Sequence, residues 1–336
     1  MQDTNEIGST GLQVTTLGLG SAPLGGLFSH VGTDEAIDTV QTAVNMGINY
    51  IDTAPLYGHG KSEELVGQSL SSLPRKSIAL STKVGRILKT TDQPPVSEHF
   101  VNLPAKKPVY DYSRDGTLKS LEDSLERLNL DSIDLLYIHD PDEGNSLYNI
   151  YDAPNHYKQV MDETLPTLID LKASNTIKAV GVGMNGCPML TQFARDGEFD
   201  CFLLAGRYTL LDQSALDDLL PLCEKKNISI VIGGPYNSGI LASDLSHNST
   251  FFYEKAPPQI LERAKAIKRV CDGYNVPLKA AALQFCLTHP SVTSVIPGAR
   301  SVDEIKENFE MSQYPIPKDL WSELSSSRLI RPDIGF

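Results

Sequence analysis

Basic residues and long apolar runs are both scarce in this 336-residue sequence. Its 29 Lys and Arg are outnumbered by 42 Asp and Glu, which gives a formal net charge of −13 at pH 7. Nucleic acids and anionic membranes bind through basic patches, so we expect neither as a partner. No apolar stretch approaches the roughly 20 residues of a membrane-spanning helix. The first ten residues are polar and unlike a secretory signal. We therefore expect a cytoplasmic protein.

Cysteine is also sparse, and its spacing excludes two kinds of site. The number of cysteines is odd, none form a C-x-x-C pair, and three lie in apolar contexts. This pattern argues against a disulfide framework and against a zinc site. We expect no metal ion and mostly buried, reduced thiols at Cys187, Cys201, Cys223, Cys271 and Cys286.

Short apolar runs alternate with amphipathic segments along the whole chain. The runs are rich in Ile, Leu and Val, as in strands covered on both faces, and predict strands at residues 16–20, 48–51, 78–82, 133–138, 179–182, 201–204, 228–232 and 294–296. Apolar residues three and four positions apart predict helices at residues 34–46, 62–70, 116–128, 160–173, 213–225, 260–274 and 302–310. Thr33 and Ser62 precede acidic first turns, and we predict both as helix N-caps.

Eight strands alternating with about as many helices indicate a parallel sheet. An open dinucleotide-binding sheet would carry G-x-G-x-x-G after its first strand, but residues 19–25 read L-G-S-A-P-L-G. We therefore predict a (β/α)8 TIM barrel forming a single domain over residues 1–336. Three long segments follow strands and would lie at the C-terminal face, where barrel enzymes keep their sites. They are residues 85–115, 139–158 and 233–258.

Polar side chains stand at the ends of successive predicted strands. Asp52, Lys83 and His139 each end a strand, and Tyr57 lies in the loop after Asp52. A phenol with a pKa of about 10 is a poor base at neutral pH, but a neighbouring ammonium favours the phenolate. A carboxylate keeps that ammonium charged, and an imidazole can bind the substrate oxygen. Taken singly, Asp52 could be a turn or cap residue and Tyr57 a packing residue. Lys83 could be a solvated charge and His139 part of a turn. Together they suit proton transfer coupled to hydride transfer.

The segment around Tyr57 resembles the signature of a known family. Residues 51–63 read I-D-T-A-P-L-Y-G-H-G-K-S-E, similar to D-T-A-x-x-Y-G-x-G-x-S-E of the aldo-keto reductases. Shorter matches follow in the expected order at residues 18–20, 81–85, 128–135, 181–185 and 295–300, so the resemblance covers about residues 7–330. It implies a catalytic tetrad of Asp52, Tyr57, Lys83 and His139, with Tyr57 as the acid or base.

The resemblance also implies a nicotinamide cofactor held without a Rossmann motif. Asn185 matches a residue that binds the nicotinamide carboxamide, and Tyr236 matches the aromatic that stacks on the ring. Met184 and Ala205 replace the usual Ser and Gln at neighbouring positions. The remaining cofactor contacts implied are Gly20, Asp52, Asn308 and, around the pyrophosphate, Ser238, Gly239 and Leu241.

The residues expected near the adenosine favour NAD over NADP. NADP-specific members commonly place Lys-Ser after Ile-Pro and an Arg six residues beyond that Lys. Here Gly298, Ala299 and Glu304 stand at these positions. A carboxylate accepts a hydrogen bond from a ribose 2′-hydroxyl but repels a phosphate. Arg300 remains able to pair with a phosphate, so NADP stays an alternative.

Three further segments resemble one branch of the family. They are Y-S-R-D-G at 112–116, I-H-D-P-D at 138–142, and residues 203–213. The branch contains the NAD-linked dehydrogenases of D-threo-aldoses, which oxidise a cyclic hemiacetal to a lactone, and the similar pyridoxal 4-dehydrogenases. The aldoses concerned include L-fucose, D-arabinose and L-galactose. The substrate contacts predicted are Tyr57, Tyr112, His139, Asp140, Arg207 and Tyr208, with salt bridges within the loops as the alternative for Asp140 and Arg207.

Other functions remain open from the sequence. Pyridoxal oxidation is the second enzymatic hypothesis, and general aldehyde or ketone reduction is the third. Some relatives of this family are regulatory subunits of potassium channels, which is the non-enzymatic hypothesis. We expect a small-molecule substrate and a monomer or small homo-oligomer.

Overall fold

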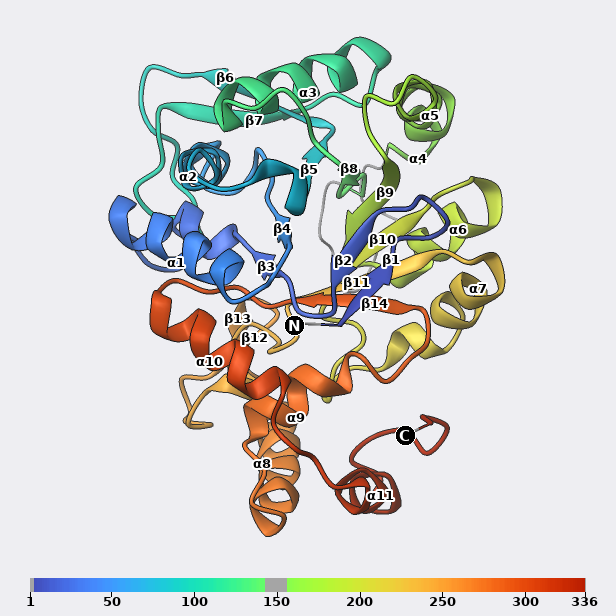
Figure 1. Ribbon diagram of the computed structural model, residues 1–336. Coiled ribbons are helices and arrows are strands. Elements are labelled where there is room, and N and C mark those ends of the chain that lie inside the picture. Colours follow the sequence, from blue (N-terminus) through green and yellow to red (C-terminus); the bar gives the residue numbers. More distant parts are fainter. Residues whose placement is uncertain (1–2, 143–155, 336) are drawn as a thin grey trace.

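The computed structural model describes residues 3–142 and 156–335, which form an eight-stranded parallel barrel surrounded by helices (Figure 1). The strand order is β14-β11-β10-β9-β8-β5-β4-β3. Parallel bridges from Leu17 to Val295 and from Gly20 to Gly298 bring the two edges together. The predicted (β/α)8 barrel is confirmed. Its strands are β3 (Leu19–Gly20), β4 (Tyr50–Asp52), β5 (Ala79–Val84), β8 (Leu135–His139), β9 (Ala179–Met184), β10 (Cys201–Ala205), β11 (Ser229–Gly233) and β14 (Val292–Ile296).

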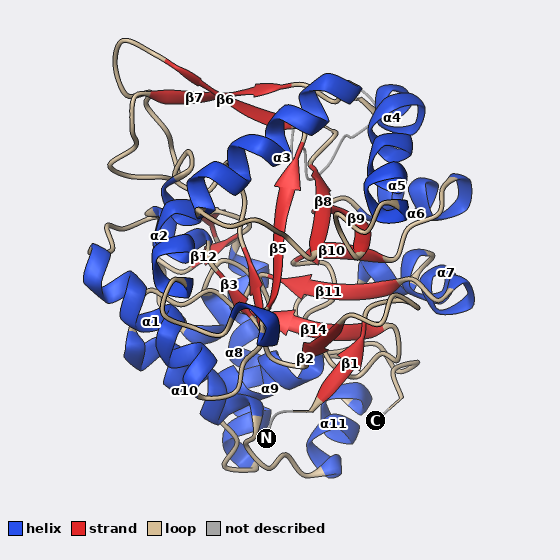
Figure 2. Ribbon diagram, turned by 45° about the horizontal axis from the view of Figure 1, so that its top comes forward, coloured by secondary structure: helices blue, strands red, loops and turns tan. Residues whose placement is uncertain are grey.

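The helices pack around the outside of the strands (Figure 2). The predicted ones are α1 (Thr33–Asn45), α2 (Lys61–Leu70), α3 (Arg114–Leu128), α7 (Leu219–Lys226), α8 (Pro258–Gly273) and α10 (Val302–Ser312). The segment predicted at 160–173 starts as α4 (Tyr157–Gln159), passes through one π-helical turn (Val160–Thr164) and ends as α5 (Leu165–Ala173). Three helices were not predicted, namely α6 (Cys187–Asp196), α9 (Leu278–Phe285) and α11 (Lys318–Ser326).

The two predicted N-caps are wrong. Helix α1 begins at Thr33 with Gly32 as its cap, and α2 begins at Lys61 with Gly60 as its cap. Ser62 lies inside the first turn of α2, where its hydroxyl is used in a tertiary contact, 2.7 Å from Ser21 Oγ. A cap requires a non-helical backbone, and in both helices the preceding glycine takes that conformation.

Three antiparallel strand pairs were not predicted. Strands β6 (Arg86–Thr90) and β7 (Lys106–Tyr110) form a hairpin within the long segment 85–115 and project beyond the barrel (Figure 2). Strands β12 (Thr250–Phe251) and β13 (Glu254–Lys255) form a short pair in the segment 233–258. Most of the third predicted segment, 139–158, lies outside the described residues. Two of the long loops therefore carry their own structure at the C-terminal face.

The third pair, β1 (Thr4–Glu6) and β2 (Gln13–Thr15), lies across the N-terminal end of the barrel (Figure 1). Ile7, Leu12 and Val14 from this hairpin join the apolar cluster inside the barrel. A second, larger cluster fills the layer between strands and helices. All five cysteines are free, and four are buried. Within residues 3–142 and 156–335, no helix has both the length and the apolarity needed to cross a membrane.

Candidate active site

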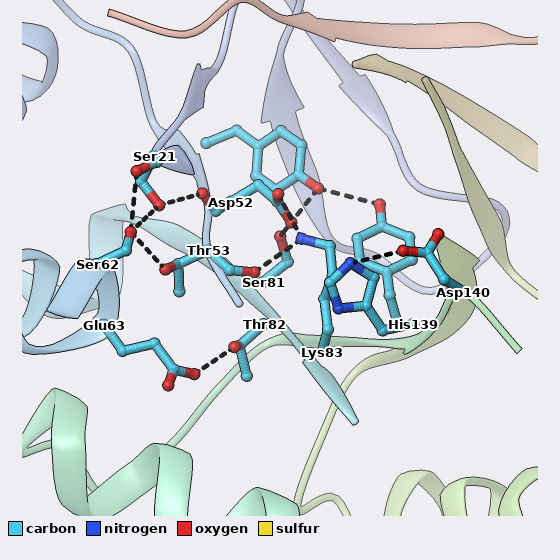
Figure 3. Close-up of polar contacts among 12 residues, drawn as sticks. Ser21, Asp52, Thr53, Ser62, Glu63, Ser81, Thr82, Lys83, His139 and Asp140 are labelled. Carbon is cyan, nitrogen blue, oxygen red and sulfur yellow. Dashed lines mark hydrogen bonds and ion pairs between the residues drawn. The ribbon is translucent and has the colours of Figure 1, made fainter. Parts of the chain in front are cut away.

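Asp52, Lys83 and His139 lie on the neighbouring strands β4, β5 and β8, at the C-terminal mouth of the barrel (Figure 3). Lys83 Nζ donates to Asp52 Oδ2 at 2.6 Å and to the Thr53 carbonyl oxygen at 2.8 Å. Both charged side chains are almost completely buried. The parallel register places these strand ends side by side, which is why distant residues meet here.

Tyr57 completes the group from the turn after β4. Its ring centroid lies 4.7 Å from Lys83 Nζ, and its ring meets that of His139 edge-on at 6.0 Å. Two glycines make the turn possible. A Cβ at Gly25 would lie 2.7 Å from the Tyr57 carbonyl carbon, and one at Gly58, where φ is +61°, would lie 2.2 Å from the Gly25 oxygen. The four residues predicted from the sequence are thus brought together.

Buried hydroxyls outside the barrel wall fix the backbone that carries Asp52. Ser21 Oγ donates to the Asp52 carbonyl oxygen at 2.7 Å, and Ser62 Oγ donates to the Ser21 carbonyl oxygen at 2.9 Å. Ser62 Oγ also lies 3.0 Å from Thr53 Oγ1 (Figure 3). Ser62 belongs to the signature segment, so this part of the signature supports the turn and does not reach the mouth.

The neighbouring Glu63 has a similar structural role. One of its carboxylate oxygens accepts from Thr82 Oγ1 and the other from Arg127 Nε, both at 2.6 Å. The side chain of Glu63 is fully buried. This contact ties α2 to β5 and α3 directly behind the strand of Lys83.

Burial dominates the electrostatics of the four residues. It raises the pKa of Asp52 above its usual value, against the attraction of Lys83, and it lowers the pKa of Lys83 against the attraction of Asp52. Burial, with smaller contributions from Asp52 and other acidic groups, raises the pKa of Tyr57 well above its usual value. Burial and nearby cations lower the pKa of His139 well below its usual value. His139 is therefore neutral at physiological pH.

The tetrad opens into a cavity of about 620 Å³ at the C-terminal face. Its floor contains Tyr57, Lys83 and His139, and its walls include Asp140, Asn185 and several loop residues. The apolar lining is Ala22, Leu27, Phe28, Leu56, Phe100, Met184, Leu203, Ala205 and Phe252. Cavities of this size hold small organic ligands and commonly combine apolar walls with a few convergent polar groups.

Phe28, His99 and Tyr253 meet at this cavity from three separate loops. The ring of His99 lies 5.4 Å from that of Tyr253 and 6.1 Å from that of Phe28. The backbone fixes the contact, because Phe28 N donates to the His99 carbonyl oxygen at 2.7 Å and Leu27 forms a bridge with Phe100. Phe28 and Tyr253 have φ values of +64° and +68°, a backbone region that aromatic residues rarely adopt.

Asp140 is the predicted substrate residue that lines the cavity beside Tyr57 and His139. Its Oδ2 accepts from Arg86 Nη2 at 2.7 Å and lies 3.5 Å from His139 Nε2. The alternative of a salt bridge for Asp140 is therefore realised. Its partner Arg86 was not predicted, because the β6–β7 hairpin that positions Arg86 left no clear pattern in the sequence.

Three other predicted substrate residues are absent from this lining. The Tyr112 hydroxyl donates to the backbone carbonyl oxygens of His139 and Asp140 and so supports them from behind. The guanidinium of Arg207 lies 3.8 Å from the ring centre of Phe252. Tyr208 places its hydroxyl 2.7 Å from Thr288 Oγ1. These side chains are engaged within the protein.

The predicted cofactor residues fall into two neighbouring groups. Asn185 lines the cavity next to the tetrad. Tyr236, beyond β11, donates through its hydroxyl to Asn308 Oδ1 at 2.9 Å, and Asn308 Nδ2 donates to the Gly298 carbonyl oxygen at 3.3 Å. Asn308 therefore joins the loop after β11 to the turn after β14, where Gly20 also pairs with Gly298.

The loop after β11 and the turn after β14 have features suited to a dinucleotide. Gly239 has a φ of +98°, and a Cβ built there would meet nothing within 4 Å, so its backbone faces open space. Leu241 is buried just beyond it. The Ser238 hydroxyl accepts from Tyr253 N at 2.9 Å and retains a hydrogen to donate. The N–H groups of Gly239 and Leu241 donate to the Tyr236 carbonyl oxygen at 3.0 and 3.2 Å, so the fit to a pyrophosphate rests on the free space at Gly239 and the Ser238 hydroxyl. The Asn185 amide fits a carboxamide.

Arg300 and Glu304 form an ion pair at the start of α10. Arg300 Nη2 lies 2.6 Å from Glu304 Oε1, and Arg300 N donates to Glu304 Oε2 at 2.8 Å. Burial acts to raise the pKa of Glu304, but the hydrogen bonds and charge of Arg300 outweigh it and lower that pKa below its usual value. Arg300, which the sequence left as a possible partner for a phosphate, is thus paired with Glu304 in the first turn of α10.

Comparison with known proteins gives the arrangement its context. The profile of the Aldo/keto reductase family matches residues 16–328. The chain belongs to the aldo/keto reductase family. Pyridoxal 4-dehydrogenase of Microbacterium luteolum is 37% identical over 340 residues, covering 96% of this chain and 97% of that protein. D-threo-aldose 1-dehydrogenase of a Pseudomonas species is 35% identical over 328 residues, with 96% of both chains covered.

A solved structure shows the same fold. The holo form of an aldo-keto reductase from Bacillus halodurans superposes with a TM-score of 0.75 at 23% identity, covering 100% of this chain and 98% of the other. As an aldo-keto reductase, the protein is an NAD(P)-dependent oxidoreductase that acts on CH–OH groups.

Proposed function

We propose that this aldo-keto reductase oxidises the anomeric carbon of a D-threo-aldose, such as L-fucose, D-arabinose or L-galactose, to a lactone with NAD. The observation that carries the proposal is Asp140, a buried carboxylate lining the cavity within 3.5 Å of His139 Nε2. Glu98 and Glu254 line the same cavity. Carboxylates accept hydrogen bonds from neighbouring hydroxyls, and a pyranose presents several such donors. A dehydrogenase of this class is among the similar relatives.

The residues divide the proton chemistry of this oxidation. An oxidised nicotinamide held by residues such as Asn185 and Tyr236 would supply the acceptor for the anomeric hydride. Tyr57, as phenolate, takes the proton of the anomeric hydroxyl as the carbon–oxygen double bond forms. Lys83 stabilises the phenolate, Asp52 holds Lys83, and neutral His139 shares a hydrogen bond with the reacting oxygen. One proton reaches Tyr57 and one hydride leaves the sugar, so charge and electrons balance.

We also propose that NAD is preferred over NADP. Binding a 2′-phosphate through Arg300 would require the guanidinium to leave Glu304, which holds it through a side-chain contact at 2.6 Å. The displaced carboxylate would then face the phosphate. A ribose 2′-hydroxyl has no such conflict, because it can donate to Glu304 while the ion pair remains.

Pyridoxal is the second candidate substrate, and the cluster of Phe28, His99 and Tyr253 favours it. Pyridoxal also forms a cyclic hemiacetal, and a flat pyridine ring can stack on aromatic side chains. The similar pyridoxal 4-dehydrogenase adds support. Such a substrate would depend on the aromatic rings more than on Asp140.

A spectrophotometric screen tests these proposals. NADH or NADPH formation is followed with L-fucose, D-arabinose, L-galactose and pyridoxal, each with both cofactors. We expect the highest kcat/KM with an aldose and NAD. A clear advantage for pyridoxal would replace the first substrate class by the second, and no turnover of any of the four compounds with either cofactor would overturn both.

A further inference from the structure

A row of buried hydroxyls lies beneath the tetrad, inside the barrel. Ser81 Oγ donates to Asp52 Oδ1 at 2.7 Å, which is the carboxylate oxygen that Lys83 does not bind. The Tyr50 hydroxyl lies 3.1 Å from Ser81 Oγ and 3.0 Å from the hydroxyl of Tyr137. Tyr137 continues the row to Cys201 Sγ at 3.3 Å.

This row is unusual for the interior of such a barrel. Tyr50, Ser81 and Tyr137 each precede a tetrad residue by two positions on the same strand, so their side chains form the layer directly below. Such layers are normally filled by branched apolar residues. Polar side chains here need a reason, since burying a hydroxyl costs free energy unless it is hydrogen-bonded.

The hydrogen bonds of this row have a common direction. A carboxylate can only accept, so Ser81 uses its single hydrogen on Asp52 and must accept from Tyr50. Tyr50 then has no hydrogen left for Tyr137 and must accept from it. Burial raises the pKa of both phenols well above the usual range, so both keep their hydrogens. The three hydroxyl donors therefore point toward Asp52, while the thiol of Cys201 donates to the Phe202 carbonyl oxygen at 3.7 Å.

The row does not reach solvent. Tyr50, Tyr137, Ser81 and Cys201 are each 0% exposed, and the β1–β2 hairpin covers this end of the barrel. It therefore cannot carry a proton away from the active site. Its effect is electrostatic, because aligned hydroxyl dipoles stabilise the charged form of the group at which they point. The centroid of the Tyr137 ring also lies 5.9 Å from the ammonium nitrogen of Lys83.

We propose that Tyr50 and Ser81 are positioning residues that keep Asp52 ionised and directed at Lys83, with Tyr137 and Cys201 completing the row. The titratable groups that face Asp52 are Lys83 from β5, Tyr57 from the turn after β4, and Tyr50 from β4 itself. The inference rests on the role proposed above for Asp52. Without the row, the carboxylate would lose one of its two side-chain partners.

Infrared difference spectroscopy of the full-length protein tests this directly. Acidification produces the C=O band of a protonated buried carboxyl group, and its loss in Asp52→Asn identifies the band of Asp52. We expect the midpoint of this band to move to higher pH in Ser81→Ala by about one unit, since a hydrogen bond to the charged form is lost. Tyr50→Phe, which is nearly isosteric, should shift it in the same direction by less, because Tyr50 acts through Ser81.

Ser294→Ala is the matched control. It removes another fully buried strand hydroxyl, one that donates to the Thr15 carbonyl oxygen and has no link to Asp52. Its midpoint should stay at the wild-type value. An unchanged midpoint in Tyr50→Phe and Ser81→Ala would overturn the proposal, and so would an equal shift in Ser294→Ala.

Kinetics separate this inference from the proposed function. In Ser81→Ala and Tyr50→Phe, we expect kcat to fall with little change in KM, because neither side chain lines the substrate cavity. If Tyr57→Phe loses turnover while both row variants keep the wild-type kcat, the proposed function is supported and the proposed role of the row is wrong. Retained turnover in Tyr57→Phe would instead remove the proposed function.

Discussion

Lys83 Nζ lies 2.6 Å from Asp52 Oδ2, with side-chain exposures of only 1% and 2%. Two charges placed so deeply have lost most of their hydration, and each is stabilised mainly by the other. Each charge therefore depends on the other, and the pair places a cation 4.7 Å from the ring centroid of Tyr57.

The first prediction concerns the stability of this pair. Asp52→Asn leaves the ammonium of Lys83 without its counter-charge, which should lower the free energy of unfolding by about 3–5 kcal/mol. Lys268→Ala, which breaks an exposed pair with Asp272, should cost about 1 kcal/mol or less. Denaturant unfolding measures both. Equal losses in the two variants would show that the buried pair is not specially coupled.

The second prediction concerns Tyr57 itself. Tyr57→Phe removes the proposed proton acceptor and leaves the cavity shape almost unchanged, so kcat should fall by about 10²–10⁴-fold. Tyr208→Phe removes a hydroxyl that contacts Thr288 and does not line the cavity, and its kcat should stay within about twofold of wild type. Steady-state kinetics with the best substrate of the screen compare the two. A large loss of kcat in Tyr208→Phe would show that Tyr208 contributes to the reaction.

The third prediction concerns pH. Burial and neighbouring carboxylates raise the pKa of Tyr57 well above its usual value. Oxidation needs the deprotonated phenolate, so its rate should keep rising with pH through the neutral range and beyond. Reduction needs the protonated phenol, which is already the dominant form at neutral pH, so its rate should not rise. Profiles of kcat against pH in both directions check this, and an oxidation rate that is flat above neutral pH contradicts it.

The fourth prediction concerns cofactor choice. Glu304→Gln removes the negative charge that occupies Arg300, so kcat/KM with NADP relative to NAD should rise by about tenfold. Glu307→Gln on the same helix, where the carboxylate pairs with Lys279, is the control and should leave the ratio unchanged. The ratio of kcat/KM values for the two cofactors is the measurement. An unchanged ratio in Glu304→Gln would show that the Arg300–Glu304 ion pair does not set the cofactor preference.

The fifth prediction separates the two substrate classes. Asp140→Asn should raise KM for an aldose by about tenfold, because the amide is a weaker acceptor for a sugar hydroxyl than the carboxylate. Tyr253→Ala should affect pyridoxal more than the aldose, because it removes a ring from the aromatic cluster. Comparing both substrates with both variants tests the assignment. If each variant lowers kcat/KM equally for the aldose and for pyridoxal, the assignment is contradicted.

The barrel and the tetrad could be predicted because they depend on regular structure. Strand ends meet in any parallel barrel, so Asp52, Lys83 and His139 could be placed from their positions after apolar runs. The aromatic cluster could not be predicted in this way. Phe28 and Tyr253 reach the cavity only through left-handed backbone conformations, which strand or helix periodicity does not reveal.

The unpredicted partners of Asp52 and Asp140 differ in what the sequence offered. Tyr50 and Ser81 had a usable signal, since side chains two positions apart on a strand share a face and both precede tetrad residues. Arg86 had none, because its side chain is aimed by the β6–β7 hairpin. Interior layers are thus open to prediction from alternation, whereas loop contacts need the three-dimensional structure.

The close approach of Gly25 to Gly58 has a consequence for how this enzyme can diversify. These glycines hold the turn of Tyr57 against the segment after β3, while Phe28, His99 and Tyr253 come from three segments, two of which are joined by the hydrogen bond from Phe28 N to the His99 carbonyl oxygen. The aromatic part of the cavity wall therefore comes largely from segments other than the turn that carries Tyr57, whereas Asp140 is adjacent to His139 in the chain. Laboratory evolution of new substrate ranges should accumulate substitutions in those loops and leave both glycines untouched.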